Sequence, residues 1–312
     1  MRICSLLPSA TEVKASLGLS DELVGISDEC DYPPFVRNVP IMVEPMIPPH
    51  GLVSAEIDRH VSTLVASGQR LYRLKEHLLR QARPDLVLSQ DLCHVCVVTP
   101  DQLHDALCSP LPHQPTVLTL NHGTVHDVTD DVVRIGDVAS RSTEGHHLAA
   151  HLRNRLEAVR TPVQGLSHRP RVVCIKWLSS LYVAGYWVPE MVQFAGGQDV
   201  LTQQGSPSRV VTWHEVLAAA LDVLIVMPCG FSVERTQTEL FQLMQQPGQW
   251  RLSSALMQHI FLVDASSYFS RPGPRLIDGI ELLAAILHLL DHDHIHESMA
   301  CHLGPLPNHQ RP

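Results

Sequence analysis

The sequence has no run of apolar residues near the roughly 20 that a helix needs to cross a bilayer. The first apolar stretch, residues 3–7, ends at Pro8, and a secretory signal needs a longer unbroken apolar segment after a positive start. These absences predict a cytoplasmic protein with no membrane insertion.

The chain also lacks an excess of basic residues. It has 32 acidic against 23 basic residues and a formal charge of −9, so it has no charge surplus to hold a phosphate backbone. We therefore expect no nucleic-acid partner. The composition, 45% hydrophobic and 18% charged, is that of a globular protein, and 312 residues are more than one hydrophobic core usually serves. Two domains are expected.

Three common catalytic signatures are missing. The sequence contains no glycine-rich phosphate loop, no G-x-S-x-G motif and no H-E-x-x-H pair. Asp127, Asp130 and Asp131 form an acidic group that we interpret as the solvated start of a helix rather than a metal site. We predict no catalytic residue, and a ligand-binding protein is favoured over an enzyme.

Strands and helices alternate along both halves of the chain, a pattern that favours parallel sheets in an α/β fold. Strands are predicted at residues 2–7, 24–27, 86–89, 116–120, 171–178, 222–227 and 259–266. An apolar pattern of helical spacing begins at residue 12 and includes Leu17, Leu19 and Leu23, and further helices are predicted at residues 71–82, 142–159, 191–195, 213–220 and 278–288. For the first helix we expect an N-cap at Ser9 or Thr11 and a stop at Gly18.

The repeated order predicts two related lobes and two further segments. We expect an N-terminal α/β lobe at residues 1–140, a linking helix at 141–165, a C-terminal α/β lobe at 166–290 and a His-rich flexible tail at 291–312. The linking helix would be stiffer than a flexible linker, so little hinge motion is expected.

Chemically distinctive side chains follow the predicted strands. Ligands of open parallel sheets bind beyond the carboxyl ends of the strands, so these residues are the candidate site. If the lobes face each other, they would line one cleft. The candidate ligand-binding residues are Pro8, Ser9, Asp31, Tyr32, Asn121, Tyr186, Trp187, Phe231, Arg271 and Arg275.

A possible metal site involves Cys93, His94 and Cys96, whose spacing is typical of half a chelate. Cys30 and Cys229 could complete a tetrahedral zinc site, or the group could bind an iron–sulfur cluster. His94 or a thiolate could instead be an axial ligand to a metal in a bound cofactor, and a redox dithiol is a further possibility. Alternatively, the cysteines are small buried residues at a tight turn.

The aromatic residues and the arginines also allow two interpretations. Tyr32, Tyr186, Trp187 and Phe231 could stack on a flat ligand, or they could pack in the core. Arg271 and Arg275 bracket a Pro-Gly-Pro turn and could bind a carboxylate or phosphate. Otherwise they hold the loop, with Asp278 and Glu281 as nearby partners.

Several motifs together resemble a known family. RICSLLPSATE, LGLSDELVGISDECDYPP and RPDLVLSQDLCHVC in the first half, with AGYWVPEMVQFAGG, VLIVMPCGF and FSRPGPRLIDGIELLAAILH in the second, resemble the cobalamin- and iron-complex-binding proteins of ABC importers. The resemblance extends to about His288. It implies two Rossmann-like lobes joined by a rigid helix, with the ligand between them, and an ABC transporter permease as a possible partner.

Two positions depart from the family pattern. Lys176 stands where an acidic residue is usual, and Tyr186 where a histidine is usual. Glu76, beside Lys75, is near the place of a carboxylate that docks to the importer. We therefore predict a protein that binds a small metal-containing ligand, either a corrinoid (cobalamin) or an iron complex, without catalysis. The alternatives are a cytoplasmic enzyme that acts on such a ligand through its cysteines, and a zinc- or iron–sulfur-binding protein.

Overall fold

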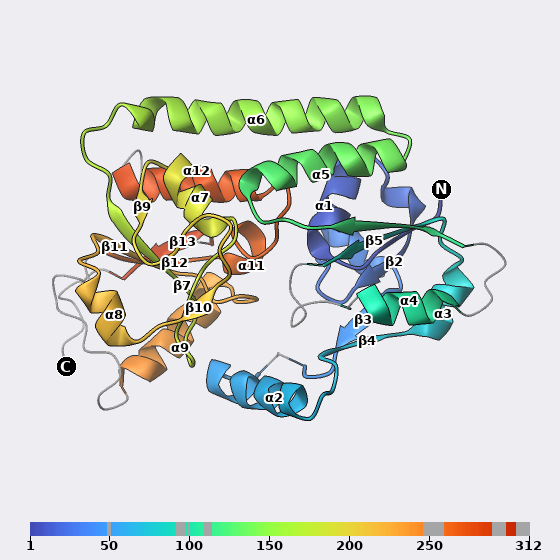
Figure 1. Ribbon diagram of the computed structural model, residues 1–312, viewed down its shortest axis with the longest axis horizontal. Coiled ribbons are helices and arrows are strands. Elements are labelled where there is room, and N and C mark those ends of the chain that lie inside the picture. The colour runs from blue at the N-terminus through green and yellow to red at the C-terminus, as the bar shows by residue number, and fades with distance from the viewer. Residues whose placement is uncertain are drawn as a thin grey trace. The chain divides into compact units, whose positions relative to one another are not determined.

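Parallel β-strands flanked by helices form the centre of each of two units (Figure 1). The computed structural model describes residues 1–48, 51–91, 98, 100–108, 114–245, 259–288 and 298–303. The first unit comprises Met1–Leu52, Glu56–His122 and His126–Arg153, and the second comprises Val53–Ala55, Gly123–Val125 and Asn154–Pro312. The predicted class, α/β with parallel sheets in two lobes, is confirmed.

The first unit contains a six-stranded sheet in the order β4-β3-β2-β1-β5-β6. Its strands are β1 (Ile3–Ser5), β2 (Leu23–Ser27), β3 (Ile41–Pro45), β4 (Tyr72–Leu74), β5 (Leu86–Gln90) and β6 (Thr116–Leu120). Only β4 runs antiparallel to its neighbour in this sheet. The helices are α1 (Pro8–Ser16), α2 (Ser54–Ala66), α3 (Glu76–Ala82), α4 (Pro100–Cys108) and α5 (Val125–Val138), with short 3-10 turns η1 (Ser20–Glu22) and η2 (Pro34–Asn38).

Along the central strands β1 and β5, successive side chains point to opposite faces of this sheet. Cys4 of β1 and Val87 of β5 belong to one buried cluster with Leu79 of α3 and Leu103 of α4. The side chains on either side of Cys4 and Val87 point to the opposite face and are also buried. Strands β1 and β5 are therefore covered on both faces, as expected for the central strands of a parallel sheet.

The second unit contains a seven-stranded sheet in the order β10-β8-β7-β11-β12-β13, with β9 paired to β7. Its strands are β7 (Arg171–Trp177), β8 (Tyr182–Val183), β9 (Gln198–Asp199), β10 (Arg209–Val210), β11 (Val223–Val226), β12 (Ile260–Val263) and β13 (Ala300–His302). Its helices are α7 (Val188–Phe194), α8 (Trp213–Ala218), α9 (Val233–Met244), α11 (Ala265–Tyr268) and α12 (Leu276–His288).

The core of the second unit lies between its sheet and the helices that follow β10 and β11. Val173 and Ile175 of β7 and Leu224 of β11 pack with Val216 of α8 and Leu240 of α9 in one buried cluster. Helices α7 and α12 pack against each other, and Figure 1 shows them on the opposite side of this sheet from α8 and α9. Both faces are therefore covered, as in the first unit.

One long helix, α6 (Ser142–Gln164), carries the chain from the first unit into the second. Its 23 residues correspond to roughly 34 Å at the rise of an α-helix. Arg153 is bound to Asp130 of α5 in the first unit, at 2.6 Å. In the second unit, Arg155 binds Asp278 at 2.6 Å and forks onto both carboxylate oxygens of Glu281, at 3.0 and 2.6 Å. The helix predicted for residues 142–159 is thus present and five residues longer.

We expect Arg155→Ala to weaken the attachment of α6 to α12 in the second unit. Glu281 and Asp278 hydrogen-bond to this guanidinium and raise its pKa. A bidentate ion pair between arginine and a carboxylate is the strongest form of a charged hydrogen bond. Partial exposure to solvent reduces its contribution to stability. The free energy of unfolding should fall by about 1 to 2 kcal/mol in urea denaturation. Arg160→Ala, which removes an exposed pair with Glu157 on the same helix, should change it by less than about 0.5 kcal/mol, and equal effects would contradict this assignment.

Two local predictions for the first unit were wrong. The helix predicted at residues 71–82 is strand β4 followed by the short helix α3, because β4 pairs antiparallel with β3. Helix α1 begins at Pro8, with Leu7 as its N-cap, rather than after Ser9 or Thr11. Proline is well suited to the first helical position because its missing N–H is not needed there. Gly18, with φ +71°, follows the helix end as predicted.

The chain end also differs from its prediction. Within the segment expected to be a flexible tail, residues 300–302 form strand β13, which pairs antiparallel with β12. Leu303 is buried in the core of the second unit, and the His302 ring lies 4.7 Å from that of Phe261. Among the helices of the described residues, none is both long and apolar enough to span a membrane.

Candidate ligand-binding edges of the two sheets

The carboxyl edge of the first sheet carries the residues that follow β1, β2 and β6. Tyr32 is 44% exposed, Asn121 is exposed and Asp31 is partly buried, so these side chains can reach a ligand. Pro8 is partly buried in the first turn of α1, and Ser9 is only 2% exposed. The edge therefore offers an aromatic ring, an amide and a carboxylate, while Ser9 belongs to the interior.

The thiols in the first unit are part of its core. Cys30 is 3% exposed, and its Sγ lies 3.1 Å from the hydroxyl of Thr11, which in turn donates to Ser5. Burial, with Cys30 nearby, raises the pKa of the Cys4 thiol. A buried and protonated thiol is a poor metal ligand. Cys4 therefore behaves as a small core residue, and the burial of Cys30 beside Thr11 places it in the core as well.

The predicted metal site gains no support from the structure. Cys93, His94 and Cys96 lie outside the described residues, and Cys229 is a partly buried free thiol in the second unit. No group of three or more His, Cys, Asp or Glu side chains suited to a metal ion occurs in the described part of the chain. Metal binding at Cys93, His94 and Cys96 stays a prediction.

A buried histidine follows β6, and the sequence interpretation missed its partner. His122 is 1% exposed, and its Nδ1 lies 2.7 Å from a carboxylate oxygen of Asp131 on α5. The other carboxylate oxygen of Asp131 accepts from Arg134 at 2.5 Å. Asp131 is 4% exposed, so the prediction that it belongs to a solvated helix start was wrong. A spacing of nine residues between His122 and Asp131 gives no signal in the sequence, because the pairing depends on the strand-to-helix turn.

In the second unit, two of the predicted aromatic contacts are buried. Trp187 is 8% exposed, and its indole N–H donates to the carbonyl of Phe269 at 2.8 Å. Phe231 is 1% exposed and packs against the ring of Trp177. Direct stacking of these two rings on a ligand does not fit their burial. Each ring instead packs against a neighbouring aromatic ring, Trp187 against Tyr186 and Phe231 against Trp177.

Tyr186 is held in a conformation that non-glycine residues seldom adopt. Its φ is +56°, and its backbone N–H donates to Ser206 at 2.6 Å while its carbonyl accepts from Gly205 at 2.9 Å. Its partly buried ring stacks on that of Trp187, with centroids 6.0 Å apart. Such backbone strain persists only where surrounding contacts enforce it, and it concentrates at ligand clamps and active sites.

A further aromatic residue, Trp177, was missed among the predicted site residues. It is the last residue of β7 and is only partly buried, although Val173 and Ile175 on the same strand face are fully buried. It thus lies at the carboxyl edge of the second sheet, where the ligand-binding residues were predicted. The signal was available, because Trp177 is the last residue but one of the strand predicted at residues 171–178, but only the residues of the loops were considered.

Arg271 and Arg275 are both partly buried and flank the turn before α12. The turn is closed by a hydrogen bond from Gly273 N–H to the Arg271 carbonyl, at 2.8 Å. Asp278 and Glu281, which we considered as partners of the two arginines, both bind Arg155. The two guanidiniums remain candidates for anionic groups of a ligand.

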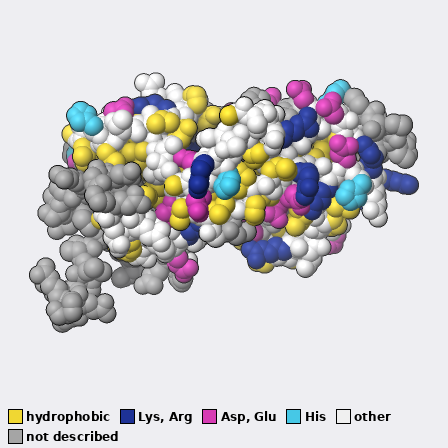
Figure 2. Space-filling model, turned by 90° about the horizontal axis from the view of Figure 1, so that it is seen from below, with side chains coloured by type: hydrophobic (Ala, Val, Ile, Leu, Met, Phe, Trp, Pro, Cys, Tyr) yellow, Lys and Arg dark blue, Asp and Glu magenta, His cyan; other side chains and the backbone are white. Residues whose placement is uncertain are grey.

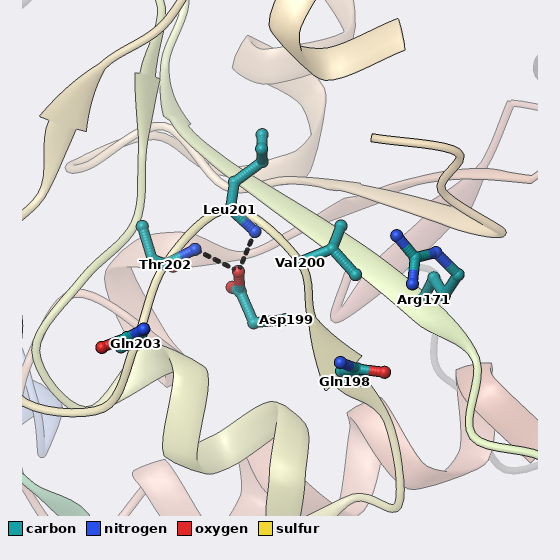
Figure 3. Close-up of a pocket in the computed structure, with 7 residues that line it drawn as sticks. All are labelled: Arg171, Gln198, Asp199, Val200, Leu201, Thr202 and Gln203. Carbon is teal, nitrogen blue, oxygen red and sulfur yellow. Dashed lines mark hydrogen bonds between the residues drawn. The ribbon is translucent and has the colours of Figure 1, made fainter. Parts of the chain in front are cut away.

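A small pocket lies at the opposite, amino end of β7 (Figure 3). It measures about 250 Å³ and is lined by Arg171, Gln198, Asp199, Val200, Leu201, Thr202 and Gln203. Asp199 accepts hydrogen bonds from the backbone of Leu201 and Thr202, and its burial raises its pKa. The Arg171 guanidinium donates to the carbonyls of Ala219 and Ala220 at the end of α8. These polar groups hold the local fold together.

Charged side chains of both signs are interspersed on the face shown in Figure 2. Among the described residues of that face, the positive side chains do not gather into a single basic patch.

Two α/β units connected by one long helix make up the fold, and the chain belongs to the periplasmic binding protein family. Residues 3–266 match the model of that family. The chain is 23% identical over 295 residues to the vitamin B12-binding protein of Vibrio cholerae, with 92% of this chain and 89% of that protein covered. The resemblance seen in the sequence is thereby confirmed.

Solved structures show the same fold. A periplasmic heme-binding protein from Pseudomonas aeruginosa superposes with a TM-score of 0.69 at 18% identity, covering 93% of each chain. The periplasmic vitamin B12-binding protein of Vibrio cholerae superposes with a TM-score of 0.63 at 19% identity, covering 92% of this chain and 96% of that chain.

The predicted cytoplasmic location was wrong. The family is one of periplasmic binding proteins, and the structural neighbours from Pseudomonas aeruginosa and Vibrio cholerae are both described as periplasmic. A short apolar stretch at the start of this sequence was a poor guide to location.

Proposed function

We propose that this chain is the substrate-binding component of an ABC importer and that it holds a corrinoid such as cobalamin. An iron-containing macrocycle is the second candidate ligand. Support comes from the similarity to a vitamin B12-binding protein along 92% of the chain and from the fold shared with a heme-binding protein. Both named ligands are large macrocycles with a metal at the centre and polar groups at the rim, so a site for either needs broad apolar surfaces and groups that hydrogen-bond the rim.

The observation that carries this proposal is the strained Tyr186. Two backbone hydrogen bonds and the stack on Trp187 fix the ring, so little conformational entropy is lost when a flat ligand binds against it. In the first unit, Tyr32 offers an exposed ring at the carboxyl edge. That the two edges face one cleft stays a prediction of the sequence.

The cysteine-based alternatives are less well supported. Cys30 is buried and hydrogen-bonded, which leaves it unsuited to attack or reduce a ligand. The similarity to a vitamin B12-binding protein favours binding without chemistry. Delivery to a permease follows from the importer role.

Titration with cyanocobalamin, followed by calorimetry and visible absorption, tests the proposal, and hemin serves as the second ligand. We expect one ligand per chain, and we expect Tyr186→Ala and Tyr32→Ala each to weaken binding about 10-fold through the lost aromatic contact. Phe241→Ala, which removes a 38%-exposed ring on α9, should leave the affinity unchanged. Neither heat nor spectral change with either ligand at high micromolar concentration would overturn the proposal.

A further inference from the structure

Two short segments from the first half of the chain belong to the second unit, and each begins a helix. Gly123–Val125 contains the first residue of α5, and Val53–Ala55 contains the first two residues of α2, whereas the rest of each helix belongs to the first unit. The first N–H groups of a helix have no acceptor within the helix. Val125 and Ser54, which begin the two helices, are fully buried, so their N–H groups need acceptors from elsewhere in the protein.

In both cases the acceptor is a buried glutamate of the second unit. Glu190, on α7, is 4% exposed and accepts from Val125 N–H at 2.5 Å. Glu239, on α9, is 6% exposed and accepts from Ser54 N–H at 2.8 Å. A carboxylate is favoured at such a place because the N-terminus of a helix carries partial positive charge. Each glutamate therefore caps a helix that is distant from it in the sequence.

Of these two helix starts, that of α5 adjoins a candidate ligand-binding residue and that of α2 does not. Asn121 is exposed at the carboxyl edge of the first sheet and lies four residues before Val125. Between them, His122 is buried, with its Nδ1 2.7 Å from a carboxylate oxygen of Asp131 on α5. The loop between β6 and α5 is thus held near its start through His122 and at its end through Val125.

We infer that Glu190 is a positioning residue that fixes the loop between β6 and α5 through Val125, and with it the direction in which the Asn121 amide meets polar groups at the rim of the macrocycle. This inference rests on the proposed function and deepens it. An amide side chain can both donate and accept hydrogen bonds. A loop that is already fixed loses less conformational entropy when the ligand binds, so its hydrogen bonds contribute more to the affinity.

The first test is a set of variants titrated with cyanocobalamin and hemin. Glu190→Asp withdraws the carboxylate from Val125 by one carbon but keeps its charge, and it should weaken binding about 5-fold, the contribution of one hydrogen bond. Glu190→Gln keeps an acceptor oxygen at the same reach and should restore most of the affinity. Glu239→Asp is the matched control, because it makes the same change at the start of α2, and it should bind as the parent protein does.

Two results of these titrations would overturn the positioning role. One is unchanged affinity in Glu190→Asp, and the other is an equal loss in Glu190→Asp and Glu239→Asp. A loss in Glu190→Gln as large as that in Glu190→Asp would overturn the hydrogen bond to Val125 as the means by which Glu190 acts.

A double-mutant cycle tests whether Glu190 acts through Asn121. Asn121→Ala should itself weaken binding about 5-fold. In that background, Glu190→Asp should cause no further loss of affinity. The same loss in both backgrounds would overturn the action through Asn121.

The second test needs no ligand, because hydrogen exchange reports on each helix start directly. In Glu190→Asp, the amides at the start of α5 should exchange about 10-fold faster, as expected when a helix cap is lost, and those at the start of α2 should be unchanged. Glu239→Asp should show the reverse. If exchange responds in this way but neither ligand binds the parent protein, the anchor at Val125 stands and the proposed function fails. If exchange at the start of α5 does not respond to Glu190→Asp, the positioning role fails whatever the protein binds.

Discussion

Lys14→Met is expected to stabilise the protein by up to about 3 kcal/mol at pH 7. Lys14 is fully buried in α1, and burial lowers the pKa of its ammonium group to about 8. A shift of that size corresponds to roughly 3 kcal/mol, at about 1.4 kcal/mol for each pH unit. The ammonium donates to the Leu19 carbonyl at 2.6 Å, but that carbonyl also accepts from Glu22 N–H at 3.1 Å. Methionine therefore removes the buried charge without leaving a buried acceptor unpaired.

The same group should make stability depend on pH in the alkaline range. Below about pH 8 the lysine is charged in both the folded and the unfolded chain, and the full cost of burying the charge is present. Between about pH 8 and the ordinary lysine pKa of 10.5, the unfolded chain binds more protons than the folded one, so the contribution of this group to the free energy of unfolding rises with pH. The advantage of Lys14→Met should shrink across this window.

Urea denaturation of the parent and the variant at pH 7, 9 and about 10.5 measures this change. Lys75→Met is the matched control, because Lys75 is partly exposed and paired with Glu44 at 2.6 Å. Its effect at pH 7 should be a loss below about 1 kcal/mol. A constant difference between the Lys14→Met variant and its parent over the whole range would show that the ammonium is not desolvated.

The predictions fit some elements better than others: helices α6 and α8 begin at the predicted residues, whereas β3 and β4 were not predicted as strands. Strand β6 was predicted at the residues it occupies, since a bounded apolar run leaves little choice. The sequence at residues 71–82 fits a helix by its apolar spacing, yet its first part is a strand because β3 offers a partner that is distant in sequence. Pairing of that kind cannot be read from a local pattern.

The place of the candidate site in the fold stays a prediction, and the sequence left the role of individual side chains undecided. The rule that ligands bind at the carboxyl ends of parallel strands led to Tyr32 and Tyr186, which remain candidates. It could not show that Trp187 is buried and that its indole N–H donates to the Phe269 carbonyl. An aromatic residue that stacks on a ligand and one that packs in the core look the same in the sequence. Trp177 lies at the same edge and was passed over because it belongs to a strand.

Gly185→Ala should have the other large effect, because this position has no room for a side chain. A Cβ atom there would lie 2.6 Å from both the Pro207 carbonyl carbon and the Ser208 nitrogen, and closer still to the Ser206 carbonyl oxygen. These are backbone atoms, which cannot move aside as the end of a flexible side chain can. We expect the free energy of unfolding to fall by about 3 kcal/mol, at the upper end of the range for overpacking.

The displaced segment is the one that holds Tyr186, so the same variant should also bind ligand less well. The Ser206 carbonyl accepts the hydrogen bond from Tyr186 N–H, and Gly205 N–H donates to the Tyr186 carbonyl. Once the segment moves, the left-handed conformation of Tyr186 loses both contacts that enforce it, and a loss of affinity of about 10-fold should follow.

Gly165→Ala provides the control for Gly185→Ala, since no atom lies within 4 Å of the Cβ that it adds after α6. Its free energy of unfolding should stay within about 0.5 kcal/mol of the parent value. Denaturation in urea and titration with cyanocobalamin measure the two effects on one pair of proteins. If Gly185→Ala lost stability but bound ligand as the parent does, the strained tyrosine would be a feature of folding alone, and the proposal would lose the observation that carries it.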